Sequence, residues 1–251
     1  MMISVRLLSP ALAALALGLA PAAAQQGEGP PSGPGHADEG MIAPLAWPVD
    51  DLYAGWRASQ ALGADVIGRN GAPIGTVADI VLDYFNQADY LVIAVAEAVA
   101  DDADGGDGTV RYAVNWGRTQ AGEDWPGPMV LDTTRDIIAQ GIDAIPEPDL
   151  DVPEEADTGW RVAGLMDAPV DMDGELPFGV VDDVIFDDSD VVQGIVVRGT
   201  GDYEGLYPVP WQQVVVEHDA AVLSVPLSPD AVDTLPRFDY DRMAEGVTPN
   251  D

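Results

Sequence analysis

The chain has 251 residues, of which 44 are Asp or Glu and only 10 are Lys or Arg, so its formal net charge at pH 7 is −34. Every basic residue is an arginine. Phosphate backbones and anionic lipid headgroups bind proteins through Lys and Arg, so this composition excludes nucleic acid and argues against direct binding to anionic membranes. Cysteine is absent and the two histidines are His36 and His218, which excludes disulfides and argues against a zinc, copper or haem site.

Residues 1–24 have the pattern of a secretory signal peptide. Arg6 supplies the positive start, a mostly apolar run follows it, and Ala22-Ala23-Ala24 offers the small residues of a cleavage site before Gln25. An uncleaved anchor is the alternative, although a spanning helix needs about 20 apolar residues and this run is shorter. We predict a cleaved peptide and a periplasmic protein.

The remaining chain is divided by segments that are poor in apolar periodicity. Residues 25–54 are rich in Gly and Pro and predict a disordered linker, although the apolar residues within 43–53 could pack on the first module. Residues 143–159 predict an acidic, Pro-rich linker, and residues 239–251 predict a frayed tail.

An internal repeat connects the two segments between these linkers. Trp56-Arg57 recurs as Trp160-Arg161, and the run that ends at Asp83 recurs in the run that ends at Asp187, so the repeats are offset by 104 residues. Trp116 recurs as Trp211 at an offset of 95, which indicates a loop nine residues longer in the first repeat. We therefore predict a first module at 55–142 and a second at 160–238.

Each module predicts short strands separated by turns. In the first repeat they lie at 64–67, 73–82, 90–99, 110–114 and 129–131, with a short helix near 133–140. In the second repeat they lie at 169–172, 178–186, 191–198, 206–209 and 221–225, with a short helix at 228–235. The predicted fold class is therefore mainly β, with two small tandem barrels that each end in a short helix. Runs such as Ile80-Val81-Leu82 and Ile195-Val196-Val197 predict strands buried on both faces, with the other module as the natural cover.

The segment Gly71-x-x-Ile74-Gly75-x-Val77-x-Asp79-Ile80-Val81-Leu82-Asp83 resembles the PRC-barrel family, whose barrel is also found in the H subunit of photosynthetic reaction centres. The resemblance covers about 56–119 and, more loosely, 160–225. It implies SH3-like barrels that act as adaptors on larger assemblies, without shared catalytic residues.

Asp79 and Asp183 occupy equivalent positions, and they could form a pair of carboxylates for acid–base chemistry. We favour a structural interpretation, in which their oxygens accept backbone N–H bonds, because no His, Lys or nucleophile accompanies either residue. No catalytic or cofactor-binding residue is therefore assigned.

The loop 101–107 carries Asp101, Asp102, Asp104 and Asp107, and it could hold calcium or other divalent cations weakly. A solvated hairpin tip is the favoured interpretation, because the loop lacks the terminal Glu of an EF-hand. The second acidic run, from Asp182 to Asp190, is a weaker candidate, and no metal site is assigned.

The tryptophans that recur in both repeats are expected in the cores, whereas Trp125 lies outside the repeat and is the candidate for an exposed contact. The favoured function is an exported, non-catalytic binding or scaffold protein that docks on an envelope or membrane protein complex. An acidic cation-binding or envelope stress protein is the alternative, and a carboxylate-based hydrolase is the least favoured hypothesis.

Overall fold

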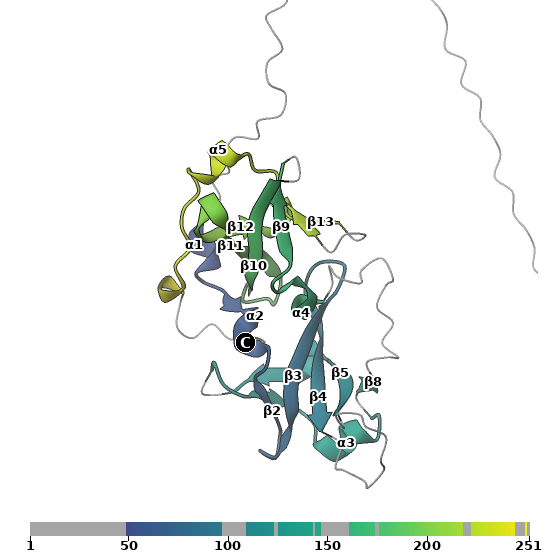
Figure 1. The fold of residues 1–251 in the computed structure, drawn as a ribbon. Coiled ribbons are helices and arrows are strands. Elements are labelled where there is room, and N and C mark those ends of the chain that lie inside the picture. Colours follow the sequence, from purple (N-terminus) through teal and green to yellow (C-terminus); the bar gives the residue numbers. More distant parts are fainter. Residues whose placement is uncertain are drawn as a thin grey trace, which may run out of the picture. The chain divides into compact units, whose positions relative to one another are not determined.

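The computed structural model describes residues 49–96, 109–122, 125–142, 144–146, 161–173, 176–217, 222–243 and 249 (Figure 1). All of them belong to one compact unit. The predicted signal peptide, Trp160, the aspartates of the loop 101–107 and most of both predicted linkers lie outside the described residues.

The first repeat forms a seven-stranded sheet with the strand order β6-β7-β2-β3-β4-β5-β8 (Figure 1). The longest strands, β3 (Pro73–Leu82) and β4 (Ala88–Ala96), form the central hairpin. The others are β2 (Asp65–Gly68), β5 (Thr109–Asn115), β6 (Thr119–Ala121), β7 (Met129–Leu131) and β8 (Ile145–Pro146). The short helices of this part of the chain are α1 (Val49–Leu52), α2 (Ala58–Ala61), the 3-10 turn η1 (Trp116–Arg118) and α3 (Arg135–Ala139).

The second repeat forms a sheet with the same order, β13-β14-β9-β10-β11-β12, and β1 (Trp56–Arg57) pairs with β10 as a further strand. Its strands are β9 (Pro169–Met172), β10 (Leu176–Phe186), β11 (Val192–Gly199), β12 (Gly205–Pro210), β13 (Val215–Glu217) and β14 (Val222–Ser224). Its helices are α4 (Val162–Leu165), η4 (Gly201–Tyr203), η5 (Trp211–Gln213), α5 (Pro229–Val232) and η6 (Tyr240–Arg242). The fold is therefore mainly β, and its two sheets share one topology. Among the described residues, the strand pairings leave both sheets open.

Equivalent irregularities shape the central hairpins of the two sheets. The pairing of β3 with β4 shifts register between Val77 and Asp79, and the pairing of β10 with β11 shifts between Val181 and Asp183. A bulge bends a strand and re-aims the side chains that follow it. Here the residue after each shift is an aspartate that the fold buries.

The short segment that begins each repeat pairs with the sheet of the other repeat. Trp56 and Arg57, at the start of the first repeat, pair with Phe186 and Ile185 of β10 in the second sheet. Arg161, at the start of the second repeat, forms the equivalent bridge to Val81 of β3 in the first sheet. The two predicted modules are therefore not separate in the structure, because residues at the start of each repeat pair with a strand of the other.

The second sheet packs against the segment that precedes the first repeat and against the end of the second repeat. Leu52 and Tyr53 pack with Val196 and Phe238 in one buried cluster, and the Tyr53 and Phe238 rings stack at 4.8 Å between centroids. The prediction that this N-terminal segment packs on the first module is wrong, because its aromatic partner lies in the second.

This packing also corrects two predictions of disorder. Residues 49–54 fall inside the predicted linker 25–54 but include α1 and the buried Tyr53. The predicted tail 239–251 begins with an ordered turn, in which the Tyr240 hydroxyl donates to Asp182 Oδ2 at 2.7 Å. Burial and this carboxylate raise the pKa of Tyr240, which keeps the hydroxyl protonated as a donor.

The prediction of strands buried on both faces is confirmed. Ile80, Val81 and Leu82 are all buried, as are the consecutive residues Ile195, Val196 and Val197. One large core cluster contains side chains from both repeats, so the two sheets share apolar packing. The other module is not the only cover, however, because Val196 packs with Leu52, Tyr53 and Phe238 in a separate cluster.

Candidate functional site

Among the described residues, the buried carboxylates of Asp79 and Asp183 connect the two repeats. Asp183, on β10, accepts hydrogen bonds from the backbone N–H of Ser59 at 3.0 Å and from the Ser59 hydroxyl at 2.5 Å. It also accepts the N–H of Val184 at 3.0 Å. Ser59 lies in the first turn of α2, whose N–H groups have no partner within the helix. A carboxylate of the second repeat therefore caps a helix of the first.

Asp79 makes the reciprocal contact from β3. Its Oδ1 atom accepts the N–H groups of Ala163 and Ile80, each at 2.8 Å. Its Oδ2 atom pairs with the Arg161 guanidinium at 3.1 Å, and this arginine is largely buried. Asp79 thus caps α4 of the second repeat, and together the two caps form what we name the reciprocal junction: Ser59, Asp79, Arg161, Ala163 and Asp183.

Burial raises the pKa values of Asp79 and Asp183 above the usual range for aspartate, and the hydrogen bonds that both accept offset part of this effect. A raised pKa in a buried carboxylate is also a common property of catalytic acids. Here, however, the donors around each carboxylate are backbone N–H groups, a serine and an arginine that hold a helix in place. The structural interpretation of the two aspartates accounts for every one of these contacts.

Asp190 links tryptophans of the first repeat to the second. Its carboxylate is buried and accepts the indole N–H of Trp56 at 3.1 Å and that of Trp116 at 2.8 Å. The Trp56 ring stacks on Phe186 at 4.3 Å and lies parallel to the Trp116 ring at 5.8 Å. The prediction that the recurring tryptophans are core residues is confirmed for Trp56 and Trp116.

The prediction that Trp125 makes an exposed contact is wrong. Its ring packs against the main core, and its indole nitrogen is buried without a hydrogen-bond partner. Sequence reasoning placed it outside because it lies beyond the repeat, but the returning segment of the first repeat folds back onto the core.

Among the described residues, the most exposed aromatic side chains lie instead in the turn 83–87, between β3 and β4. The side chain of Tyr84 is 71% exposed and that of Phe85 is 81% exposed. Asp83 fixes this turn, because its Oδ1 atom accepts the N–H groups of Phe85 and Gln87 at 2.8 and 2.9 Å. The aromatic pair is therefore presented on an ordered turn, which we name the aromatic turn.

The equivalent turn of the second repeat shows that the fold does not need these aromatics. Asp187 there accepts the N–H groups of Ser189 and Val191, each at 2.9 Å, in the same geometry. At the offset of 104 residues, Tyr84 and Phe85 correspond to Asp188 and Ser189, which are polar. Alignment of the repeats at this turn would have revealed the difference in the sequence.

The surroundings of the aromatic turn are acidic. Asp83 belongs to it, and Asp89 follows shortly after it, where burial and the nearby Asp83 charge raise its pKa. The turn of the second repeat lies alongside, because Gln87 donates to the Ser189 carbonyl at 3.0 Å and Ala88 donates to that of Asp190 at 2.9 Å. The aromatic turn therefore has an apolar tip that is surrounded by acidic residues.

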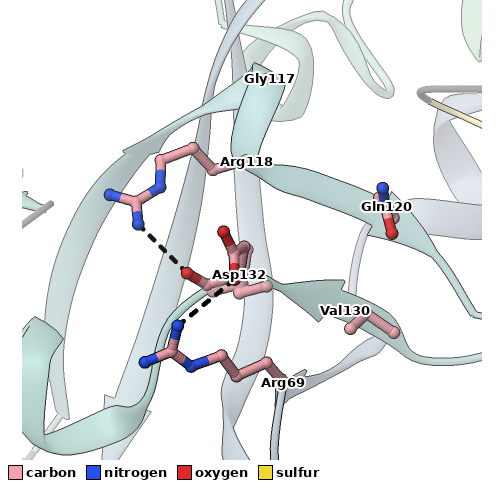
Figure 2. Close-up of a pocket in the computed structure, with 7 residues that line it drawn as sticks. Arg69, Gly117, Arg118, Gln120, Val130 and Asp132 are labelled. Carbon is pink, nitrogen blue, oxygen red and sulfur yellow. Dashed lines mark hydrogen bonds and ion pairs between the residues drawn. The ribbon is translucent and has the colours of Figure 1, made fainter.

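A pocket of about 300 Å³ lies beside β6 and β7 in the first repeat (Figure 2). It is lined by Arg69, Gly117, Arg118, Gln120, Val130, Leu131 and Asp132. Figure 2 shows the side chains of Arg69 and Arg118 directed toward Asp132 from opposite sides. Neither Asp79 nor Asp183 lines this pocket, so it does not offer the carboxylate pair that the hydrolase hypothesis requires.

Within the described part of the chain, no group of three or more His, Asp or Glu side chains could hold a metal ion, and the acidic loop 101–107 lies outside that part. None of the described helices is long and apolar enough to cross a membrane. The chain matches no protein-family model, and no curated protein is significantly similar to it. The resemblance to the PRC-barrel family therefore stays a prediction that rests on the repeated motif.

Proposed function

We propose that the chain is an exported, non-catalytic binding protein, built from two PRC-type barrels, that docks on a protein of the bacterial envelope through the aromatic turn. The observation that carries this proposal is the exposure of Tyr84 and Phe85 on an ordered turn whose counterpart is polar. Exposed aromatic residues are enriched at the energetic centres of protein interfaces, because they bury much apolar area at low entropic cost.

The charge around the aromatic turn specifies the partner further. The tip carries the aromatic pair and its rim carries Asp83, Asp89 and Asp188. A complementary surface has an apolar pocket that receives the rings and Lys or Arg side chains around it. Such a partner is attracted from a distance by the charge of −34, and the association rate falls as salt is added.

The reciprocal junction supports a scaffold rather than an enzyme. Two buried carboxylates are committed to helix capping, and they hold the first and second repeats together. The turns 83–87 and 187–191 are joined directly by the bridge between Gln87 and Val191, so a rigid connection of the repeats keeps the aromatic turn in one orientation. Preorganisation of this kind lowers the entropic cost of binding.

The test uses the full-length chain produced in its native cell, with the photoreactive residue p-benzoylphenylalanine at position 85. Irradiation is expected to yield one adduct of defined mass from this site. The matched control carries p-benzoylphenylalanine in place of Val215, a residue of β13 that is 57% exposed. No such adduct is expected from this control.

A second arm combines the crosslinker at 85 with Tyr84→Ser, which removes the neighbouring ring. The yield of adduct is expected to fall several-fold, because the exposed Tyr84 ring belongs to the proposed contact surface. A thermal melt establishes that the variant is folded. Equal adducts from positions 85 and 215, or no adduct from either, would refute docking through the aromatic turn.

A further inference from the structure

Residues 238–242, which we name the C-terminal strap, attach to the second sheet and to the segment that precedes the first repeat. The Phe238 N–H donates to the Leu206 carbonyl of β12 at 2.8 Å. The Arg242 guanidinium lies over the Tyr53 ring, 4.2 Å from its centroid. The strap is therefore held by a backbone hydrogen bond and by contacts of charged and aromatic side chains.

Arg57 adds a contact to the strap from the start of the first repeat. Its guanidinium lies 4.7 Å from the centroid of the Tyr240 ring. The equivalent residue of the second repeat is Arg161, at the offset of 104, and it pairs instead with Asp79 Oδ2 at 3.1 Å. Asp183 is the counterpart of Asp79, but its contacts with described residues include no ion pair with Arg57. The equivalent arginines therefore take two different positions in one fold.

One side chain accounts for this difference. The Ser59 hydroxyl donates to Asp183 Oδ2 at 2.5 Å, the oxygen equivalent to the one that Arg161 contacts on Asp79. The residue equivalent to Ser59 is Ala163, which has no hydroxyl. The bonds from the backbone N–H groups to Oδ1 are the same in both repeats. A serine hydroxyl and an arginine therefore compete for one carboxylate oxygen.

The charge of Arg57 acts on both groups between which it lies. Burial raises the pKa of Asp183, and the bonds from Ser59 and the charge of Arg57 oppose that rise. Burial and the hydrogen bond to Asp182 raise the pKa of Tyr240, and the charge of Arg57 again opposes the rise. The guanidinium is thus within electrostatic reach of the Asp183 carboxylate while it lies over the Tyr240 ring.

We propose that Arg57 is a two-position switch that couples the reciprocal junction to the C-terminal strap. While Ser59 occupies Asp183 Oδ2, the guanidinium stays over Tyr240 and holds the strap. When the hydroxyl leaves, Arg57 turns to the carboxylate, as Arg161 does in the second repeat, and the strap loses its cation–π contact. The cover of the second sheet thus responds to the contact between the repeats. This device is independent of the proposed docking function, because none of its residues belongs to the aromatic turn.

Hydrogen exchange of the ¹⁵N-labelled chain tests this coupling, because the Phe238 N–H exchanges when the strap opens. The Val77 N–H, which donates to the Ala64 carbonyl at 2.9 Å in the first repeat, reports general changes in stability. Ser59→Ala is expected to raise the exchange rate of Phe238 about three- to five-fold relative to that of Val77, as the loss of one cation–π contact at a partly exposed site implies. Ser59→Thr keeps the hydroxyl, and its exchange ratio is expected to equal that of the native chain.

Arg57→Gln distinguishes the switch from a general loosening of the junction. It removes the contact with Tyr240, so it is expected to raise the ratio of Phe238 to Val77 exchange by a similar factor, and adding Ser59→Ala to it is expected to have no further effect. Dispersed amide spectra establish that the variants are folded. The proposal is overturned if Ser59→Ala leaves the exchange ratio unchanged, or if it raises the ratio as much in the Arg57→Gln background as in the native chain.

Discussion

The contact between Ser59 and Asp183 allows the coupling of the two repeats to be measured directly. Ser59→Ala removes the hydroxyl that donates to Asp183 Oδ2 at 2.5 Å, and it leaves the backbone N–H of the same residue bonded to Oδ1 at 3.0 Å. Asp183→Ala removes the acceptor of both bonds and also that of the Val184 N–H. The two variants and their combination form a double-mutant cycle across the reciprocal junction.

The expected magnitudes follow from the number of bonds lost. A hydrogen bond to a charged group contributes about 1.5–3 kcal/mol when it is buried, and we take about 1 kcal/mol for Ser59→Ala because this serine is exposed on one side. Asp183→Ala is expected to cost about 3 kcal/mol, since it leaves two N–H groups without their acceptor while relieving the burial of a charge. The coupling energy is expected to equal most of the unfolding free energy that Ser59→Ala alone removes, about 1 kcal/mol.

The assay is equilibrium unfolding in urea, with the slope of the transition as a check that the denatured state is unchanged. The matched control is Ser189→Ala, because its hydroxyl makes only a 3.4 Å contact with Asp188 in an exposed turn. The control is expected to change the free energy of unfolding by less than about 0.5 kcal/mol. A Ser59→Ala variant no less stable than the control, or a coupling energy near zero, contradicts the capping role of Asp183.

Three further predictions concern single positions. Gly75→Ala is expected to lower the free energy of unfolding in urea by several kcal/mol, because the added methyl group would overlap the Ala94 carbonyl. In the control Gly71→Ala the methyl group meets no atom, so the free energy of unfolding is expected to fall by only about 1 kcal/mol because of the positive φ. Trp116→Phe is expected to cost about 2 kcal/mol by the same assay, as the Asp190 carboxylate loses an indole donor, and a fully stable variant would contradict this. The folded-state pKa of Asp183 is raised, so its stabilising contribution is complete below the unfolded value of about 3.9 and is lost as pH rises through the folded value. Asp183→Asn is therefore expected to flatten the pH dependence of stability over that window, as measured by urea unfolding at a series of pH values.

The sequence predicted those parts of the fold that local patterns determine. The predicted bounds of β3, β7 and β9 agree with the structure, because turn residues and alternating or continuous apolar residues mark each end. The prediction of two related modules rested on the order of Trp, Gly and Asp residues, and the shared strand order agrees with it. Gly75 and Gly179 recur for a steric reason, since the partner strand's backbone passes too close for a side chain.

The exchange of the leading segments could not be predicted in this way. Nothing in the residues around Trp56 or Arg161 shows which sheet they join, because pairing partners distant in sequence leave no periodic signal. The same limit explains why Trp125 was placed on the surface. The structural role of Asp79 was anticipated, but its partners Arg161 and Ala163, 82 and 84 residues away, were not.

The comparison of the repeats separates what the fold needs from what it does not. The positions that match, such as the junction aspartates Asp79 and Asp183, make contacts that hold the two sheets together. The positions that differ include the aromatic turn, which belongs to the first repeat. Because duplication begins with equivalent surfaces, a structural role alone gives no reason for exposed aromatic side chains to be present on one repeat only. The first repeat is therefore the one expected to meet the partner, and the second completes and orients it through the reciprocal junction.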